Sequence, residues 1–156
     1  MRAKIVIADE GLATIAYELN KVLADVLLLY LKTRKAHWNV EGSDFYAKHK
    51  FFEDQYEQLG GTMDDVAERI RSIGHYAVAS WAEFSRLTHL TEQSRQNNDS
   101  IGFIKELLID HESLIVKLRE NITRFAEEFK DLGTSDFVTG LMQKHEKMAW
   151  MLRSHL

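Results

Sequence analysis

The stretch EQLGGTMDD, Glu57 to Asp65, contains two adjacent glycines, and such a pair usually marks a turn. Apolar residues around the glycines nevertheless recur at alternating steps of four and three, in the order Phe52, Tyr56, Leu59, Met63, Val66, Ile70 and Ile73. Because this is the period of one helical face, it predicts a continuous helix from about Ser43 to Ile73. Two glycines inside a helix cost about 1 kcal/mol each relative to alanine, so their presence needs a separate explanation.

Three other long segments carry apolar stripes with the same helical period. Helices are expected at about Glu10–Trp38, from Asp99 or Ser100 along a stripe that ends at Phe129, and from about Ser135 to Leu156, with a short helix within Ser80–Leu87. The absence of proline suits long helices, since proline removes a backbone donor and clashes with the preceding turn. The link NVEGS joins the first two helices, and Ser43 or Asp44 is available as a cap. The sequence therefore predicts an all-α, four-helix bundle with a short extra helix in the long middle connection.

Composition narrows the class of protein. With 45% apolar residues in 156, the chain is expected to form one domain, 1–156, with a sizeable core. The lack of cysteine excludes disulfides, thiolate metal sites and thiol nucleophiles. The apolar run Val22–Leu31 is too short to span a membrane, and the start lacks a signal-peptide core, so a soluble, cytoplasmic protein is expected. The net charge of −4 argues against a nucleic-acid-binding surface over the whole chain.

The predicted second helix carries two pairs of candidate metal ligands. His49 and Glu53 are four residues apart, as are Asp64 and Glu68, so each pair projects from one face of the helix. His49 and Asp64 are about 22 Å apart along the axis, which excludes one ion bound by both within a single chain. The sequence also contains no Glu-x-x-His motif, which the standard intrachain di-iron bundle requires.

The two pairs are symmetric about a point between residues 58 and 59. If two copies of the helix packed antiparallel about a two-fold axis, His49 and Glu53 of one copy would face Glu68 and Asp64 of the other. Gly60 lies on the same stripe, close to the symmetry point. The missing side chains would let the two helices approach closely where they cross, which explains the glycine pair.

His37 favours a metal site over the alternative, a solvated face in a chain with 24 acidic residues. It ends the first helix about one turn before the NVEGS link, so the fold-back of the chain brings it beside the start of the second helix. His37 and His49 are then able to share an ion with Glu53 and with carboxylates of a second copy. Two imidazoles and several carboxylates, without sulfur, suit Fe(II), Mn(II) or Zn(II).

The segment KAHWNVEGSDFYAKHKFFEDQYEQLGGTMDDVAERIRSIG, Lys35 to Gly74, resembles the signature of the Dps proteins, which are ferritin-like mini-ferritins named as DNA-binding proteins from starved cells. The ending HEKMAWMLRSHL is similar to their final helix, so the resemblance covers nearly the whole chain. It implies a hollow dodecamer, built from two-fold dimers, that protects against oxidative stress. Such a cage is a ferroxidase for iron storage: it oxidises Fe(II) to Fe(III), preferentially with hydrogen peroxide rather than oxygen, and stores ferric mineral inside.

Carried over residue by residue, the resemblance implies a ferroxidase site shared by two subunits. His37 and His49 come from one subunit in this interpretation, and Asp64 and Glu68 come from its two-fold mate. Glu53 matches a position that is acidic in the family. The ligand types leave Mn(II) and Zn(II) open as competing ions.

Three further residues match functional positions of the family. Trp38 matches a tryptophan beside the iron that is thought to absorb oxidising equivalents; the alternative is packing at a helix end. Asp131 and Asp136 match acids that line the three-fold pores through which ions enter. Their alternative role is a favourable charge at the N-terminus of the last helix.

Basic residues near the start of the chain are few. Relatives that bind DNA often use a lysine-rich tail, whereas only Arg2 and Lys4 precede the first helix here. Weak or absent DNA binding is therefore expected. The competing hypothesis for function is a Dps-like shell that acts as a structural or DNA-coating protein with a weak metal site.

The remaining histidines carry no metal-binding pattern. His111 and His145 lie on apolar stripes and are expected to be satisfied core or interface residues. His75, His89 and His155 belong to no pattern that predicts a role.

Overall fold

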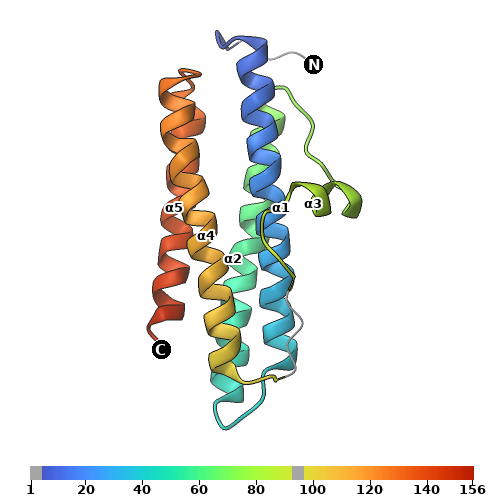
Figure 1. Cartoon of the computed structure of the whole chain (residues 1–156), viewed down its shortest axis with the longest axis vertical. Coiled ribbons are helices and arrows are strands. Elements are labelled where there is room, and N and C mark those ends of the chain that lie inside the picture. The colour runs from blue at the N-terminus through green and yellow to red at the C-terminus, as the bar shows by residue number, and fades with distance from the viewer. Residues whose placement is uncertain (1–4, 93–96) are drawn as a thin grey trace.

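A computed structural model describes residues 5–92 and 97–156 of the chain. These residues form four long helices and one short helix, whose arrangement is drawn in Figure 1. The helices are α1 (Asp9–Asn39), α2 (Phe45–Ser72), α3 (Trp81–Leu87), α4 (Ser100–Glu127) and α5 (Leu132–Arg153). The described residues contain no strand, only one isolated bridge between Glu41 and Asp99. The all-α prediction is confirmed. Arg2 and Lys4 lie outside the described residues, as do residues 93–96 of the predicted polar loop.

The long helices form two antiparallel pairs, α1 with α2 and α4 with α5, and α1 also packs against α4. The short helix α3 stands beside α1, away from the other pair (Figure 1). The apolar stripes meet in one core, whose largest fully buried side chains include Phe52, Phe125, Ile15, Leu19, Leu59, Ile70, Ile104 and Leu118. Each such side chain stabilises the fold by about 1.5–3 kcal/mol through burial. None of the helices among the described residues is long and apolar enough to span a membrane.

Helix α2 runs through Gly60 and Gly61 without a break, as the apolar period predicted. A methyl group added at Gly60 would lie 3.7 Å from the Tyr30 ring, which is ordinary contact, and one at Gly61 would meet nothing within 4 Å. Packing within one chain therefore leaves room for alanine at both positions. Since alanine is also the better helix former, the glycines have no explanation inside the single chain.

The link between α1 and α2 begins directly after Asn39 and is tight. The Val40 N–H donates to the Ala36 carbonyl at 2.9 Å, and Gly42 has a φ of +127°, a left-handed conformation that favours glycine. Asp44 occupies the cap position of α2, but its side chain makes no capping hydrogen bond. The Asp44 carboxylate instead accepts a hydrogen bond from the Ser100 hydroxyl at 2.7 Å. The prediction of a side-chain cap here was wrong, because the carboxylate joins the starts of α2 and α4.

Helix α5 begins at Leu132, three residues before the predicted start at Ser135. The Asp131 carboxylate accepts a hydrogen bond from the Thr134 N–H at 2.9 Å and thereby caps the helix. Arg69 of α2 holds the same corner: it lies 3.6 Å from the Asp131 carboxylate and donates to the Thr134 hydroxyl at 2.8 Å. The glycine and hydroxyl residues after Asp131 suggested a loop, but the cap allows them to form the first helical turn.

Removal of this cap provides a test of the α5 start. We expect Asp131→Ala to lower the free energy of unfolding by about 1–2 kcal/mol, because the first turn of α5 loses its acceptor and Arg69 loses a partner. Urea denaturation measures the change. Asp136→Ala is the matched control: this exposed carboxylate on the same helix makes no cap, and its loss should change stability by less than about 0.5 kcal/mol. Equal losses in the two variants would contradict the assignment.

Candidate metal centre

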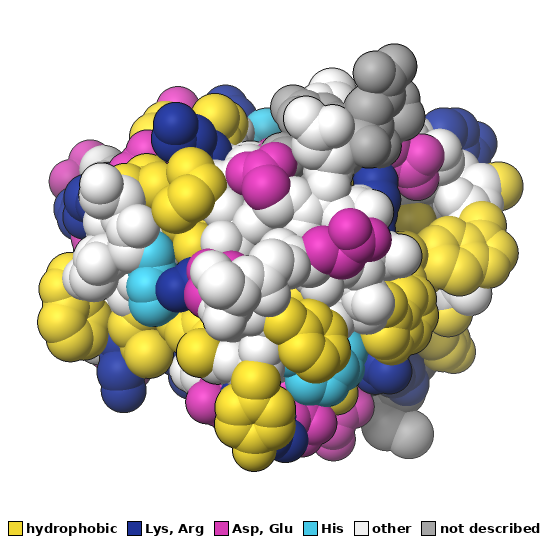
Figure 2. Space-filling model, turned by 90° about the horizontal axis from the view of Figure 1, so that it is seen from below, with side chains coloured by type: hydrophobic (Ala, Val, Ile, Leu, Met, Phe, Trp, Pro, Cys, Tyr) yellow, Lys and Arg dark blue, Asp and Glu magenta, His cyan; other side chains and the backbone are white. Residues whose placement is uncertain are grey.

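His37 and His49 lie face to face at the end of the bundle where α1 turns into α2. Their rings are stacked, with centroids 3.8 Å apart and planes inclined by 21°. His37 belongs to the last turn of α1 and is buried, whereas His49 belongs to the first turns of α2 and is half-buried. Figure 2 views this end of the molecule and shows histidine side chains at the surface among apolar groups and charges of both signs. The sequence prediction that the fold-back joins these two histidines is confirmed.

Reciprocal hydrogen bonds orient the two rings. The His37 Nδ1 lies 2.8 Å from the His49 carbonyl, and the His49 Nδ1 lies 2.8 Å from the His37 carbonyl. A carbonyl oxygen only accepts, so each Nδ1 carries a proton, and in the neutral ring the lone pair is therefore on Nε2. Backbone contacts of this kind fix the tautomer and the direction of metal-binding histidines. The pair is therefore prepared to offer two neutral Nε2 atoms to a cation.

Glu53 lies one turn after His49 and is half-buried. Its carboxylate forms an ion pair with Lys50. The hydrogen bond from Lys50 lowers the pKa of Glu53, and the neighbouring His37 and His49 lower it further in their charged forms. Glu53 is therefore a carboxylate at neutral pH, and a cation bound beside it would compete with the Lys50 ammonium group.

Asp64 and Glu68 are exposed and lie further along α2. Among the described residues, no three histidine or acidic side chains gather in a place that could hold a metal ion. One chain thus brings His37 and His49 together but does not bring Asp64 and Glu68 to them. The neighbouring Asp65 forms an ion pair with Lys144 at 2.9 Å. No lysine or arginine of the described residues forms an ion pair with Asp64 or Glu68.

Aromatic and cationic side chains surround the histidine pair, and sequence reasoning missed most of them. The Tyr56 ring meets the His37 ring edge to face, with centroids 5.1 Å apart. The Arg34 guanidinium lies 4.5 Å from the Tyr56 ring centre and 5.1 Å from that of Trp38. Trp38 is 60% exposed, so it does not pack at the helix end within the single chain. The helical spacing of Arg34 and Trp38 was a usable signal, since residues four apart share a face.

The two predicted pore residues differ in position. Asp131 is only 4% exposed and is engaged by Thr134 and Arg69, so it caps the start of α5, where its alternative interpretation placed a favourable charge. A pore role for Asp131 stays a prediction, because a three-fold pore forms only between assembled copies of the chain. Asp136 is exposed on the first turns of α5 and is still available for that role.

His111 and His145 form a buried pair between α4 and α5. Both side chains are completely buried, with their Nδ1 atoms 3.0 Å apart. The core assignment is confirmed, but the expectation of satisfied histidines was wrong, because neither Nε2 has a hydrogen-bond partner. Burial lowers the pKa of His145 to about 4 and holds the pKa of His111 well below its usual value. The pair is therefore neutral near pH 7 and contributes no charge to the core.

The sequence of this chain is similar to those of known proteins. The ferritin-like domain family matches residues 17–156. An uncharacterized low temperature-induced protein of Nostoc sp. (strain PCC 7120) is 42% identical over 155 residues, which cover 99% of this chain and 87% of the relative. The DNA protection during starvation protein of Helicobacter pylori (strain J99) is 34% identical over 138 residues, covering 88% of this chain and 95% of the relative.

Solved structures agree with these matches. The Dps protein from Vibrio cholerae O1, described as a member of a broad superfamily of ferritin-like diiron-carboxylate proteins, superposes with a TM-score of 0.90 at 27% identity. That match covers 98% of this chain and 95% of the Vibrio chain. Dps from Thermosynechococcus elongatus gives a TM-score of 0.87 at 28% identity, with 94% and 92% of the two chains covered.

The buried histidine pair predicts a specific dependence of stability on pH. In the unfolded chain, His111 and His145 take up protons near pH 6.5. In the folded chain, the pKa of His145 is about 4 and the pKa of His111 is well below its usual value, so both stay unprotonated until the pH is much lower. Their contribution to stability is therefore complete above about pH 6.5 and is lost as the pH falls toward 4, by at most about 1.4 kcal/mol per pH unit for each histidine. We expect the urea midpoint to fall between about pH 7 and pH 5.

The double variant His111→Leu/His145→Leu tests the cause of that dependence. It removes both titrating groups from the core, so the slope between these pH values should flatten. His75→Leu, which changes a partly exposed histidine, should leave the slope unchanged. An unaltered slope in the double variant would show that other groups cause the acid sensitivity.

Proposed function

The chain belongs to the ferritin-like Dps proteins, and on this basis we propose that it oxidises Fe(II) and stores the ferric product. Iron is both substrate and cargo in this proposal, and hydrogen peroxide, in preference to oxygen, is the oxidant. The observation that carries it is the His37–His49 pair, whose hydrogen bonds leave both Nε2 atoms free to bind iron. Neutral imidazole and carboxylate are ligands that suit Fe(II).

The proposed iron site is shared by two copies of the chain. His37, His49 and Glu53 of one copy bind iron together with Asp64 and Glu68 of the partner subunit. The supporting observations are the symmetric spacing of the ligands along α2 and the exposure of the two carboxylates, which are not engaged by cations of the described chain. An isologous contact about a two-fold axis forms two such sites at once.

The glycine pair supports the same contact. Alanine fits at Gly60 and Gly61 within the single chain and would favour the helix, so glycine there suits the close approach of a second helix. Exposed aromatic side chains lie beside the histidine pair: Trp38, next to His37 in the chain, is 60% exposed, and Phe45, whose ring centre lies 5.2 Å from that of His49, is 44% exposed. Apolar groups of this size favour burial against another surface. We propose that six such dimers form a hollow dodecamer in the cytoplasm.

The chemistry follows from the ligand set. Each of two Fe(II) ions gives up one electron, and the two electrons break the O–O bond of one peroxide to give two hydroxide ions, so no hydroxyl radical is released. Carboxylate oxygens bind Fe(III) more strongly than Fe(II), and the acids therefore assist the oxidation. The protein positions the irons while the redox chemistry belongs to the metal. Zn(II) or Mn(II), which suit the same ligands, are expected to compete for the site.

Two further residues have proposed roles in this reaction. Trp38, adjacent to His37 in the chain, is proposed to accept oxidising equivalents that escape the two-electron reaction. Its ring lies under the Arg34 guanidinium, whose positive charge makes a tryptophan cation less stable there, so a neutral radical is the favoured product. Asp136 is proposed to line an entry pore for iron in the assembled cage.

The ferroxidase proposal is tested by peroxide consumption. Under anaerobic conditions we expect the protein to consume about one hydrogen peroxide for every two Fe(II) ions, because two one-electron oxidations reduce one peroxide. His37→Ala/His49→Ala should lose this stoichiometry, since iron loses both nitrogen ligands. Stopped-flow absorbance and a peroxide assay measure the two reactants. If the wild type and the double variant both oxidised iron as free iron is oxidised in solution, the proposal would be wrong.

Subunit mixing tests whether the site is shared. His37→Ala/His49→Ala and Asp64→Ala/Glu68→Ala should each be inactive alone. A dimer with one copy of each variant contains one site with all its ligands and one site that keeps only Glu53. Co-refolded mixtures should therefore regain activity, up to about a quarter of the wild-type rate for random pairing. No recovery, with dimers present, would contradict a site built from two chains.

The second candidate function is a DNA-coating shell, suggested by relatives named for DNA protection. The exposed cations argue against strong DNA binding, because many are paired with acids, including Arg119 with Glu146, Lys144 with Asp65 and Arg153 with Glu112. The net charge of −4 has the same effect. We expect little DNA to shift in a gel at about 150 mM salt, since binding requires free basic groups near phosphates. A near-stoichiometric shift at that salt would favour the coating function.

A further inference from the structure

A chain of hydrogen bonds joins Asp25, His89 and Ser113, three residues that the iron site does not use. The His89 Nδ1 lies 2.6 Å from the Asp25 carboxylate, and the His89 Nε2 lies 3.0 Å from the Ser113 hydroxyl. The residues come from α1, from the segment after α3, and from α4. Both distances lie in the range that joins acid, base and nucleophile in a serine triad.

Asp25 fixes the tautomer of His89. Its side chain is buried, and one oxygen accepts hydrogen bonds from the Thr88 hydroxyl at 2.7 Å and from the His89 N–H at 2.9 Å. The second oxygen accepts the hydrogen bond from the His89 Nδ1. Because Nδ1 carries the proton, Nε2 keeps a lone pair and accepts the hydrogen bond of the Ser113 hydroxyl. His89 is thereby oriented as a base toward that hydroxyl.

Ser113 differs from several hydroxyl residues of the long helices that bond to their own backbone. Thr14, Thr33 and Thr62 donate back to the carbonyl four residues earlier in their own helices, at 2.7–3.0 Å. The Ser113 hydroxyl points instead across to His89. Ser135 of α5 likewise bonds outside its own helix, to the Ile122 carbonyl at 2.9 Å, so the distinguishing feature of Ser113 is that its partner is a histidine.

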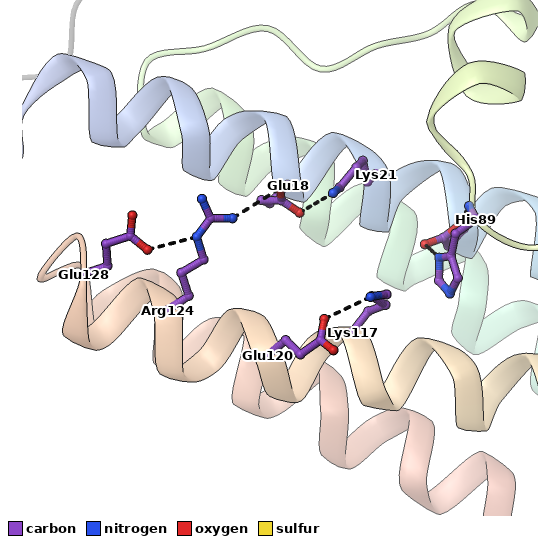
Figure 3. A network of polar contacts seen from close by, with 8 residues as sticks. Glu18, Lys21, His89, Lys117, Glu120, Arg124 and Glu128 are labelled. Atoms are coloured by element: carbon purple, nitrogen blue, oxygen red, sulfur yellow. Dashed lines mark hydrogen bonds and ion pairs between the residues drawn. The ribbon is translucent and has the colours of Figure 1, made fainter.

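A polar cavity adjoins the base. Its volume is about 230 Å³, and Asp25, His89 and Lys117 contribute to its wall; Ser113 is not a lining residue and reaches this site through its hydrogen bond to His89. Figure 3 shows His89 together with the neighbouring ion pairs, including Lys117 with Glu120, between α1 and α4. Lys117 follows Ser113 by one turn on the same face of α4, with its ammonium group held by Glu120 at 3.0 Å. The size suits a short acyl group and is below that of drug-sized sites.

We propose that Ser113 is an activated nucleophile that hydrolyses small carboxylic esters, with His89 as its general base and Asp25 as the positioning residue. The Ser113 oxygen attacks the ester carbonyl carbon while its proton moves to the His89 Nε2. The C–O bond to the alcohol breaks, and the alcohol leaves with that proton, which gives an acyl ester on Ser113. Water then attacks the acyl carbon, His89 again carries the proton, and the carboxylic acid leaves with Ser113 restored.

The competing interpretation is a structural fastening of the segment after α3. In that case Asp25 and His89 hold the segment against α1, and the Ser113 hydroxyl has ordinary reactivity. The two interpretations differ in the reactivity of one side chain, which stability measurements alone do not report. A probe that records covalent labelling at Ser113 separates them.

The test uses the full chain and an alkyl fluorophosphonate, a reagent that labels activated serines. We expect one label per chain, located on Ser113 by peptide mass spectrometry, and none on Ser113→Ala. His89→Gln should slow labelling at least about 100-fold, the usual contribution of a general base. The matched controls are Ser85→Ala and His75→Gln, which change residues outside the hydrogen-bonded chain and should label at the wild-type rate.

A second measurement follows turnover of p-nitrophenyl acetate. Release of p-nitrophenol should be lost in Ser113→Ala and slowed in His89→Gln, as for labelling. The melting temperature and Fe(II) oxidation should stay unchanged in Ser113→Ala. Label scattered over several side chains, or labelling of Ser113 at equal rates in His89→Gln and wild type, would overturn the proposal. These outcomes do not depend on the iron site, so the two proposals succeed or fail separately.

Discussion

The link from Val40 to Asp44 is too short to do anything but reverse the chain, and the location of the proposed iron site depends on this reversal. It sets α1 and α2 antiparallel, so a histidine near the end of one helix meets a histidine near the start of the next. The reciprocal bonds between the rings and the backbone carbonyls then hold both Nε2 atoms available. With a longer link, closing the loop would cost more conformational entropy, and the hydrogen bonds between the two histidines and the backbone would have to offset that cost.

The bundle core carries a different kind of constraint, because it buries several ionisable groups. Lys32 of α1 forms ion pairs with Glu106 and Asp110 of α4, and all three side chains are buried. Burial raises the pKa of Asp110, although Lys32 opposes the shift. Buried ion pairs add little net stability, but removing one partner leaves an uncompensated charge. These ion pairs form only when the face of α1 that carries Lys32 packs against the face of α4 that carries Glu106 and Asp110, so they determine which helix faces meet.

The position of the proposed iron site distinguishes this bundle from an intrachain di-iron design. In that design the ligands project into the middle of the bundle, from Glu-x-x-His motifs on facing helices. Here the middle is filled by Phe52, Leu59 and the neutral pair His111–His145. The proposed ligands lie instead at the end of α1, where His37 stands, and along one stripe of α2, which makes the chemistry depend on assembly. The family comparisons support this chemistry at the level of the superfamily, whereas the shared site rests on the symmetry of α2.

Much of this could be read from the sequence, because helical periodicity and the His-Trp segment are local signals. The period through Gly60 and Gly61 determined that α2 is continuous, and the ligand spacing along α2 was equally visible. The start of α5 was missed because a cap made by Asp131 depends on its side-chain direction. The tautomers of His37 and His49, and the meeting of Asp25, His89 and Ser113, were decided only by the tertiary structure. Side chains far apart in sequence carry no periodic signal, and packing alone brings them within hydrogen-bond distance.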